Sequence, residues 1–424
     1  MIVDNVLEVI YAPRKALKRI AANPKYISAI LVIILFIGLQ IAFEYQQFSN
    51  VYTEQTSPVI TALPSYITAS NWNSNANVSN NFGDDFNYTI YTAYGYYPNL
   101  FGNSSLEFSA QNTNNVQAGL TNVSDGFKPE SNVDCSEVGY QNLSMIVKMV
   151  EPQTAPLNAT LTLYTLTSDT NYYQYDLTPT MSNLVVGQWN NLTIPVGKTA
   201  SGWTATGIPS WSNITSLTLG FTYPDNSNVT IHIGAMFFRG QFLTPTQQDS
   251  TGLLLNFLNR YSLDILFSWF LITGLMFLLL KALKVTAVWK PLFIGAGCVL
   301  IVMVIRSIVS LAAAATLSAV YYPFDALPGV GLTPWGTAYY PQGVEGTLFA
   351  SSQAVIANIS ESTSIFNYIT GAMFVFSYVW LGVLGAMLLG AINPDLSAYK
   401  RAIISTAAIV VTVLVLIFLV VGVA

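Results

Sequence analysis

The sequence predicts a membrane protein in which five transmembrane helices carry one large all-β sandwich domain, inserted between the first and second helices. Of its 424 residues, 52% are hydrophobic and 9% are charged, whereas soluble domains carry roughly 25% charged residues. The apolar residues gather in five long runs, and the stretch between the first two runs is rich in Asn, Ser, Thr and Tyr. The predicted segments are a cytoplasmic amphipathic basic segment at 1–26, the first transmembrane helix at 27–44, an extracellular β-sandwich domain at 45–250, and transmembrane helices 2–5 at 251–424 with an extracellular loop at 318–364.

Each apolar run is long enough, or nearly so, for a helix that crosses a bilayer, which takes about 20 apolar residues. The runs are Ile27–Phe43, Tyr261–Leu280, Leu292–Leu317, Ile365–Ile392 and Ala402–Val423. Asp4 and Glu8 precede the first run, and no small-x-small cleavage site follows it. The first run is therefore predicted to be an uncleaved anchor rather than a signal peptide.

The direction of insertion follows from the basic residues, which mark short cytoplasmic loops. Three short segments hold ten of the sixteen basic residues, namely Arg14, Lys15, Lys18, Arg19, Lys25, Lys281, Lys284, Lys290, Lys400 and Arg401. The segment 318–364 holds none. We therefore expect a multi-pass protein of the cell membrane with its N-terminus in the cytoplasm and its C-terminus outside.

Asn-x-Ser/Thr acceptors for N-linked glycans give a second indication of sidedness. They occur at Asn77, Asn87, Asn103, Asn122, Asn142, Asn158, Asn191, Asn213, Asn228 and Asn358. All ten fall in segments assigned to the outside. An Asn-rich sequence also produces such triplets by chance, so this pattern predicts a glycoprotein without identifying the occupied positions. Together with the low charge, it suggests an archaeal cell-surface protein.

The N-terminal segment 2–22 is predicted to form two short helices separated at Pro13. Val3, Val6, Leu7 and Ile10 lie at helical spacing, and basic residues follow Pro13. Either the apolar stripe lies on the inner leaflet beside anionic headgroups, or it packs against the ends of the transmembrane helices. The sequence leaves both alternatives open.

The residues Pro13-Arg14-Lys15-Ala16-Leu17-Lys18-Arg19-Ile20, followed by Asn23-Pro24-Lys25, resemble the opening of the Yip-domain family. That resemblance covers residues 1–45 and 255–424. It implies a five-helix bundle with a cytoplasmic N-terminus, and eukaryotic members are linked to vesicle traffic and small GTPases. The insertion of about 210 residues after the first helix departs from the family's plan, so family likeness supplies a fold and little chemistry.

Arg306 stands near the middle of the third predicted span, with Asp264 and Glu44 as its candidate partners. Charged residues inside a membrane are costly and often functional. One hypothesis is a structural lock between helices; the other is contact with a lipid phosphate or a transported anion. The fourth span carries Gly371, Gly382, Gly385 and Gly390, which favour close packing within the bundle.

Between the first two spans, short alternating runs of β-branched and aromatic residues predict a β-sandwich. The runs are Ser104–Gln111, Leu143–Val150, Ala159–Thr167, Tyr172–Leu177, Trp189–Pro195, Ser216–Phe221 and Val229–Phe238. The stretch Gly139–Gly240 resembles the jelly roll of galactose-binding-like domains and carbohydrate-binding modules. That superfamily often has an aspartate pair in the last strand, and here Gly234-Ala235 occupies the comparable place. The resemblance therefore gives little indication of which ligand the domain binds.

Four aromatic residues are candidates for stacking on glycan: Trp203, Trp211, Tyr172 and Tyr173. Trp189, at the start of a strand, is expected in the core. His232 lies within a strand and is expected to be structural, and the lone Cys135 is expected to be buried. Cys298 lies in a predicted span, so no disulfide is expected.

The sequence favours a non-enzymatic surface scaffold or accessory subunit whose β domain contacts glycan or a protein partner. It has no nucleophile–base pair, phosphate-binding glycine loop or metal-ligand cluster, so no cofactor or metal is predicted. A net charge of −5 argues against nucleic acid as a partner. The alternative is a transporter or lipid-handling protein whose helix bundle works around Arg306, and a cavity reaching Arg306 would favour it.

Overall fold

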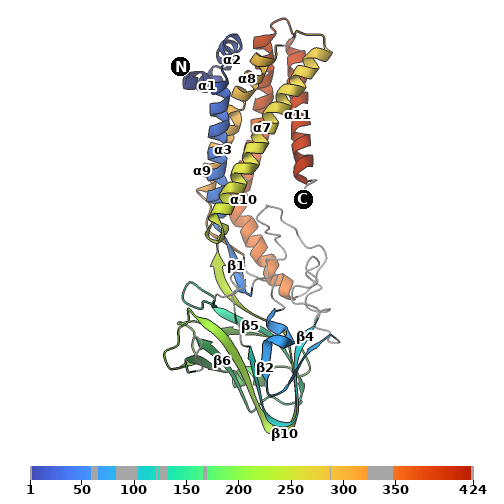
Figure 1. Ribbon diagram of the computed structural model, residues 1–424. Coiled ribbons are helices and arrows are strands. Elements are labelled where there is room, and N and C mark those ends of the chain that lie inside the picture. The colour runs from blue at the N-terminus through green and yellow to red at the C-terminus, as the bar shows by residue number, and fades with distance from the viewer. Residues whose placement is uncertain are drawn as a thin grey trace. The chain divides into compact units, whose positions relative to one another are not determined.

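A computed structural model of the protein describes residues 2–58, 65–82, 104–120, 123, 132–165, 170–286, 288–322 and 347–421. The chain divides into two compact units. The helix unit comprises Met1–Val51, Thr244–Val320 and Asn358–Ala424, and the β unit comprises Tyr52–Leu243 and Tyr321–Ala357. The predicted insertion of a β domain between the first and second spans is confirmed (Figure 1). A second chain segment, 321–357, joins the β unit, which was not predicted.

The helix unit contains the helices α1 (Ile2–Tyr11), α2 (Pro13–Ala22), α3 (Tyr26–Phe48), α6 (Pro245–Gln248), α7 (Ser250–Ala282), α8 (Trp289–Val299), α9 (Ile301–Ala314), α11 (Ala398–Val421) and most of α10 (Thr347–Ile392). Within the described residues, five helical segments are long and apolar enough to cross a membrane: α3, α7, α8 with α9, α10 and α11. They coincide with the five predicted runs. Their insertion and its direction stay predictions.

The third span lies at the centre of the bundle. In its most apolar stretch, 72% of residues are buried, against 28–33% in the other four spans. Gly295 and Gly297 leave room for Leu388 and Trp269 to approach the backbone of α8. The span divides into α8 and α9 at Leu300, whose carbonyl accepts a hydrogen bond from the N–H of Met303 at 2.8 Å. The helix tightens there without a proline.

The loop predicted at 318–364 is wrong over its second part, because 347–364 form the first turns of α10. The prediction placed the start of this helix at Ile365, where the membrane-like hydropathy begins. Ser, Asn and Glu residues upstream lowered the hydropathy without preventing a helix. Helix propensity and membrane hydropathy are separate properties, and only the second was used to define the boundary.

The N-terminal segment forms two helices that meet at Pro13, as predicted. Ala16, Leu17 and Ile20 of α2 are buried in the hydrophobic core of the helix unit. Of the predicted stripe, Leu7 is 48% exposed, while the side chains of Val3 and Val6 lie outside the described ones. These contacts favour packing against the bundle, through α2 more than through the predicted face of α1.

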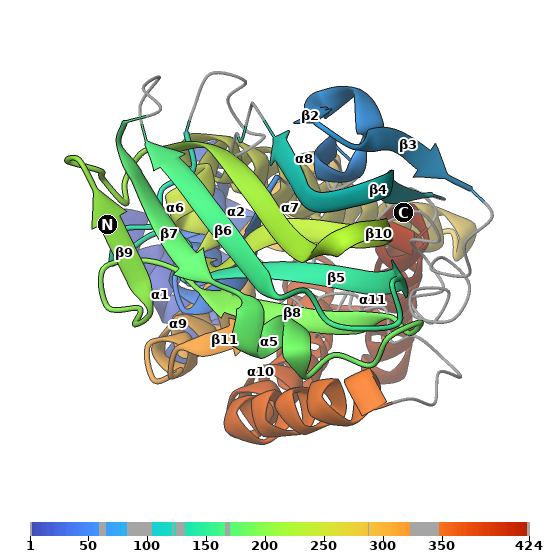
Figure 2. The ribbon, with the colours of Figure 1, turned by 90° about the horizontal axis from the view of Figure 1, so that it is seen from below.

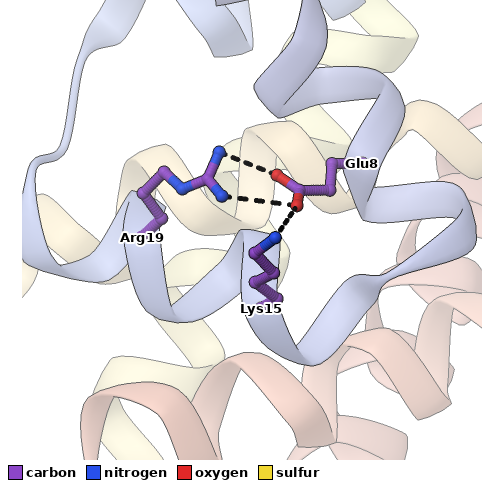
Figure 3. Close-up of polar contacts among 3 residues, drawn as sticks. All are labelled: Glu8, Lys15 and Arg19. Carbon is purple, nitrogen blue, oxygen red and sulfur yellow. Dashed lines mark hydrogen bonds and ion pairs between the residues drawn. The ribbon is translucent and has the colours of Figure 1, made fainter.

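A buried carboxylate joins α1 to α2 (Figure 3). Glu8 lies 2.8 Å from Arg19 and 3.4 Å from Lys15, and its own side chain is only 9% exposed. Each basic residue comes from the helix after Pro13, so the ion pairs hold the two short helices together. In the sequence, Glu8 argues against a signal peptide but gives no indication of these ion pairs.

The β unit contains antiparallel strand pairs in a network of eleven described strands. They are β1 (Val51–Ser57), β2 (Trp72–Ser74), β3 (Asn77–Asn81), β4 (Ser105–Leu120), β5 (Asn142–Glu151), β6 (Asn158–Thr165), β7 (Tyr172–Asp176), β8 (Asn190–Pro195), β9 (Trp203–Thr206), β10 (Ile214–Leu243) and β11 (Val320–Tyr322). All seven predicted strands are confirmed, and the last two are parts of the single long β10. The short strands β1, β2, β3, β9 and β11 were not predicted.

Strand β10 organises the β unit because it is long enough to serve two half-sheets. Residues 214–222 pair with β6, residues 230–239 pair with β5, and β4 follows the other edge of both parts. Figure 2 shows β6, β10 and β4 side by side. Leu217 and Phe221 from the first part and Ile231 and Phe238 from the second belong to one hydrophobic core. The two half-sheets thus enclose a common core, as in a sandwich.

Candidate functional site: a charged cavity in the helix unit

A cavity of about 470 Å³ lies within the helix unit and brings together the three charged residues predicted from the sequence. Glu44 comes from α3, Asp264 from α7 and Arg306 from α9, and all three line the cavity. Helix α10 adds Phe374 and Tyr378 to the lining, and α11 adds residues such as Thr412 and Leu416. Residues far apart in the sequence therefore share one polar site inside an otherwise apolar bundle.

Six polar lining residues were not identified from the sequence: Gln40, Arg260, Tyr261, Ser268, Tyr378 and Thr412. Helical spacing could have found some of them. Gln40 and Glu44 are four residues apart on α3, and Arg260 and Asp264 are four apart on α7, so each pair shares a helix face. Tyr378 could not be found in this way, since it has no charged neighbour on α10.

The acidic residues of the cavity have polar partners on α7. The Tyr261 hydroxyl donates a hydrogen bond to Glu44 Oε1. The guanidinium carbon of Arg260 lies 5.6 Å from the centre of the Tyr261 ring, and its charge acts on both Glu44 and Asp264. Arg260 thus compensates the negative side of the cavity.

Arg306 has a different environment. Its guanidinium carbon lies 4.8 Å from the centre of the Phe374 ring, and it interacts with the Tyr378 hydroxyl. Within the parts of the chain that the structure describes, Arg306 forms no ion pair with Asp264 or Glu44. The predicted partners share the cavity with Arg306 but do not pair with it, so the structure does not contain the direct ion-pair lock.

In this arrangement Arg306 contacts an aromatic ring and, among the described residues, forms no ion pair with a carboxylate. A guanidinium has five donors in a planar fork that suits carboxylate and phosphate oxygens. Apolar side chains such as Phe36, Phe43 and Leu416 make up much of the remaining wall. The chemistry therefore suits an anion that carries an apolar part.

Three of the four aromatic residues nominated for glycan contact form a cluster in the β unit. Tyr173 and Trp211 stack with ring centroids 3.9 Å apart, and Trp203 meets Trp211 edge-on at 5.3 Å. Trp203 Nε1 donates to Pro195 O at 2.7 Å. Burial raises the pKa of the Tyr173 hydroxyl. Much of the surface of these rings is in contact with the other rings and with the hydrophobic core.

Tyr172, the fourth nominated aromatic, lies apart from this cluster. It alternates with Tyr173 along β7 and therefore points to the opposite side of the strand. There it meets Tyr164 of β6, with ring centroids 5.7 Å apart. The nominated residues thus belong to two faces of the half-sheet rather than to one binding platform.

A groove of about 570 Å³ runs beside the aromatic cluster, and Tyr173 and Trp211 form part of its wall. Glu137 and Lys198 also line it and lie 3.8 Å apart as an exposed ion pair. Three serines, Ser136, Ser210 and Ser212, also line the groove, together with Val138 and Pro209. In this groove, two of the aromatic residues predicted to contact glycan lie beside polar and charged side chains.

The remaining predictions for single residues of the β unit are largely confirmed. His232 is buried and lies 3.1 Å from Glu107 on the neighbouring strand, which is a structural position. Cys135 is a buried free thiol, as Cys298 is in the helix unit, and burial raises the pKa of the Cys135 thiol well above its usual value. Trp189, expected in the core, is only half-buried, beside Lys148.

Six of the ten glycan acceptors have described side chains, and all six are in the β unit. Asn77, Asn158, Asn191 and Asn228 are exposed, and Asn142 and Asn213 are half-buried. Asn87, Asn103 and Asn122 lie outside the described residues, as does the side chain of Asn358. Glycosylation stays a prediction, and the exposed positions are those that a glycan can occupy without rearrangement.

Comparisons with known proteins found no matching family model and no matching curated protein. Among solved structures, the family 11 carbohydrate-binding module from Clostridium thermocellum, in complex with a β-1,3-1,4-mixed-linked tetrasaccharide, is 15% identical. The match covers 40% of this chain and 88% of that one, with a TM-score of 0.25. A structure of promiscuous carbohydrate-binding modules of the β-sandwich superfamily is 13% identical, over 45% of this chain and 56% of that one, with a TM-score of 0.24. Likenesses of this extent do not assign a ligand to this chain.

Proposed function

We propose that this protein binds an amphipathic anion inside its helix bundle, with the charged end of the ligand at Arg306, and that it serves as a lipid-handling protein of the cell membrane. The observation that carries the proposal is the cavity that contains Arg306 without an ion-pair partner among the described residues. A transported or stored lipid needs both a polar contact for its headgroup and apolar walls for its chain, and this cavity offers both.

The volume of the cavity and the free-energy cost of placing a charge in a membrane span both support this function. The volume of about 470 Å³ falls within the roughly 300–1,000 Å³ typical of small-molecule sites. A charged side chain in a membrane span costs roughly 2.5–3.5 kcal/mol or more, so it is rarely kept without a role. A structural role would call for an ion pair with a carboxylate, whereas Glu44 accepts a hydrogen bond from Tyr261 and, among the described residues, neither Glu44 nor Asp264 forms an ion pair with Arg306.

The proposal is tested with the full-length protein in mild detergent, with oleate and dodecyl phosphate as single-chain anionic probes. Native mass spectrometry counts the bound probe molecules. We expect the wild-type protein and Arg306→Lys to bind a probe, and Arg306→Leu to lose it. Lys281→Leu, which removes an equal charge from an exposed position outside the cavity, is the matched control. Equal binding by Arg306→Leu and the wild-type protein would reject the proposal.

Glycan recognition by the β unit is a second candidate function. The groove beside Tyr173 and Trp211 supports it, because it combines aromatic rings with serine hydroxyls and a Glu–Lys pair. The mutual stacking of the rings limits the area that a sugar can contact. We therefore rank it below lipid handling.

Isothermal titration of the full-length protein with a panel of soluble oligosaccharides tests the second function. Trp211→Ala should abolish heat release, whereas Trp189→Ala, which removes a half-buried tryptophan outside the groove, should not. Binding that survives Trp211→Ala would place the sugar elsewhere, and absence of binding to the whole panel would reject a role in recognising those glycans.

The side of the membrane on which each unit acts follows from the direction of insertion predicted from the sequence. In Figure 1, α2, the connection from α7 to α8 and the connection from α10 to α11 lie at the same end of the helix unit, which we call the basic end. A cytoplasmic basic end would put the β unit outside the cell, where it can act as an accessory or scaffold module towards protein partners. Membership of the Yip-domain family is proposed on the same topology.

A further inference from the structure

A second concavity of the helix unit, separate from the Arg306 cavity, runs along α10 and α11. It encloses about 1,120 Å³. On α10 it extends from Phe374 to Ala391, about 26 Å at 1.5 Å per residue. Its walls are apolar over most of that length, with valines and small residues such as Val379, Gly382 and Ala386. We call it the α10–α11 groove.

One end of the groove is strongly basic. Arg14 and Lys18 of α2 and Arg401 of α11 line it there, beside Pro394. Arg14 and Lys18 are exposed and Arg401 is half-buried. Among the described residues, none of the three forms an ion pair, and the nearby Asp395 is itself exposed and unpaired. The groove therefore joins a long apolar wall to a cationic end.

The four basic residues of α2 divide into two pairs with different partners. Lys15 and Arg19 bind Glu8 (Figure 3), whereas Arg14 and Lys18 line the groove. Members of each pair are four residues apart and so share a helix face. The buried Glu8 neutralises one face and fixes the orientation of α2, which leaves the other face positively charged at the groove.

Arg401 provides a second observation, because one of its buried donor groups has no hydrogen-bond acceptor among the described residues. Its Nη2 donates to Pro394 O at 2.6 Å, but its buried Nε has no acceptor among the described residues. The nearby Asn393 Nδ2 is likewise buried without one. Gly390 leaves space for the guanidinium, because a Cβ there would stand 2.5 Å from Arg401 Nη1. Donors that lack an acceptor are costly, so an anion at this place would be stabilising.

We propose that the α10–α11 groove is a binding site for one phospholipid with an anionic headgroup, whose phosphate contacts Arg14, Lys18 and Arg401 and whose acyl chain lies along α10. The apolar wall and the cationic end match the two parts of such a lipid. The groove also shares Phe374 and Tyr378 with the wall of the Arg306 cavity, so the lipid tail would reach the side chains that contact Arg306. The basic residues of the groove do not line the Arg306 cavity, so this site does not depend on the proposed function.

The test measures phospholipid bound to full-length protein in nanodiscs that contain phosphatidylcholine with increasing phosphatidylglycerol, followed by gentle extraction and native mass spectrometry. We expect one phosphatidylglycerol per chain retained through this groove, in addition to any molecule held at Arg306, and none retained through it with phosphatidylcholine alone. Lys18→Gln should weaken retention about fivefold, as expected for about 1 kcal/mol per surface charge. Lys15→Gln removes the same charge from the same helix, three residues away, and should leave retention unchanged, since Lys15 is bound to Glu8 and 72% exposed.

A second pair of variants tests the apolar wall. Gly382→Leu should fill the groove and release the lipid, because a Cβ at Gly382 meets nothing closer than 3.9 Å. Gly371→Leu, on the same helix, in open space and outside the lining, should not. In the Arg306→Leu background, where the Arg306 cavity is expected to lose its ligand, the groove should still retain its lipid and still respond to Lys18→Gln, which separates this site from the proposed function. Equal effects of Lys18→Gln and Lys15→Gln, displacement of the lipid by inorganic phosphate, or a dimer that covers the groove would each overturn the proposal.

Discussion

Two arginines, one in each unit, differ in the way the fold uses them. Arg239 of β10 lies against Glu54 of β1, with Nε and Nη2 each 2.9 Å from a carboxylate oxygen. Their side chains are 17% and 4% exposed. Arg306 of α9 shares a cavity with two carboxylates but pairs with neither among the described residues. The first arginine is fully engaged within the protein, and the second has donors left for a ligand.

An arginine inside a fold indicates a ligand site only when its surroundings leave its donors without a carboxylate. A bidentate pair such as Arg239–Glu54 fixes two strands relative to each other and leaves no site for a ligand. An arginine held by an aromatic ring and a hydroxyl keeps most of its hydrogen-bonding capacity. The sequence marks Arg306 as unusual through its apolar neighbours, whereas Arg239 becomes unusual only once β1 lies beside β10.

The largest expected effect is that of Arg239→Leu. It removes the positive charge that lies against the buried carboxylate of Glu54, which should destabilise the β unit by about 3–5 kcal/mol. The free thiols report this locally, because Cys135 belongs to the β unit and Cys298 to the helix unit. Labelling by a maleimide should become faster at Cys135 and stay slow at Cys298. The double variant Arg239→Leu, Glu54→Leu should restore slow labelling; if it does not, the ion pair is not the cause.

An intermediate effect is expected for Glu8→Gln. It removes the partner of Lys15 and Arg19 but leaves both of these exposed enough to be hydrated. We expect α1 to detach from α2, with a loss of about 1–2 kcal/mol for a half-buried charged hydrogen-bond pair. Amide hydrogen exchange should increase in α1 and not in α7. Unchanged exchange in α1 would mean that apolar contacts, rather than Glu8, hold the helix.

The smallest effect on stability is expected for Arg306→Leu. Because no carboxylate depends on Arg306, its removal should change the thermal midpoint of the helix unit by less than the effect of Glu8→Gln. Cys298 labelling in detergent should remain slow. A large loss of stability would support the structural lock between helices and would remove the contrast with Arg239.

The sequence predicted the elements of the fold well where one local property decides them. The five apolar runs and the seven alternating strands appear at the expected places, since hydropathy and period-two alternation are local. The short strands β2, β3 and β9 escaped prediction because tertiary pairing with β4 and β7 forms them. The start of α10 was misplaced because hydropathy was used as the marker of a helix.

The candidate site was predictable only in part, for a similar reason. Arg306, Asp264 and Glu44 stood out as charges in or near apolar runs, and the structure places them around one cavity. Their lack of direct pairing depends on angles between helices, which no local pattern encodes. The role of Lys18 at the α10–α11 groove depends on Glu8 engaging its neighbours, which becomes visible only in three dimensions.

Electron cryo-microscopy of the full-length protein in lipid nanodiscs tests most directly whether Arg306 binds a ligand in the cavity. We expect density for a bound molecule within hydrogen-bonding distance of the Arg306 guanidinium, in the cavity between α3, α7 and α10, and no such density for Arg306→Leu. An empty cavity with Arg306 in a direct ion pair with Asp264 or Glu44 would contradict the claim and establish a structural role for this arginine.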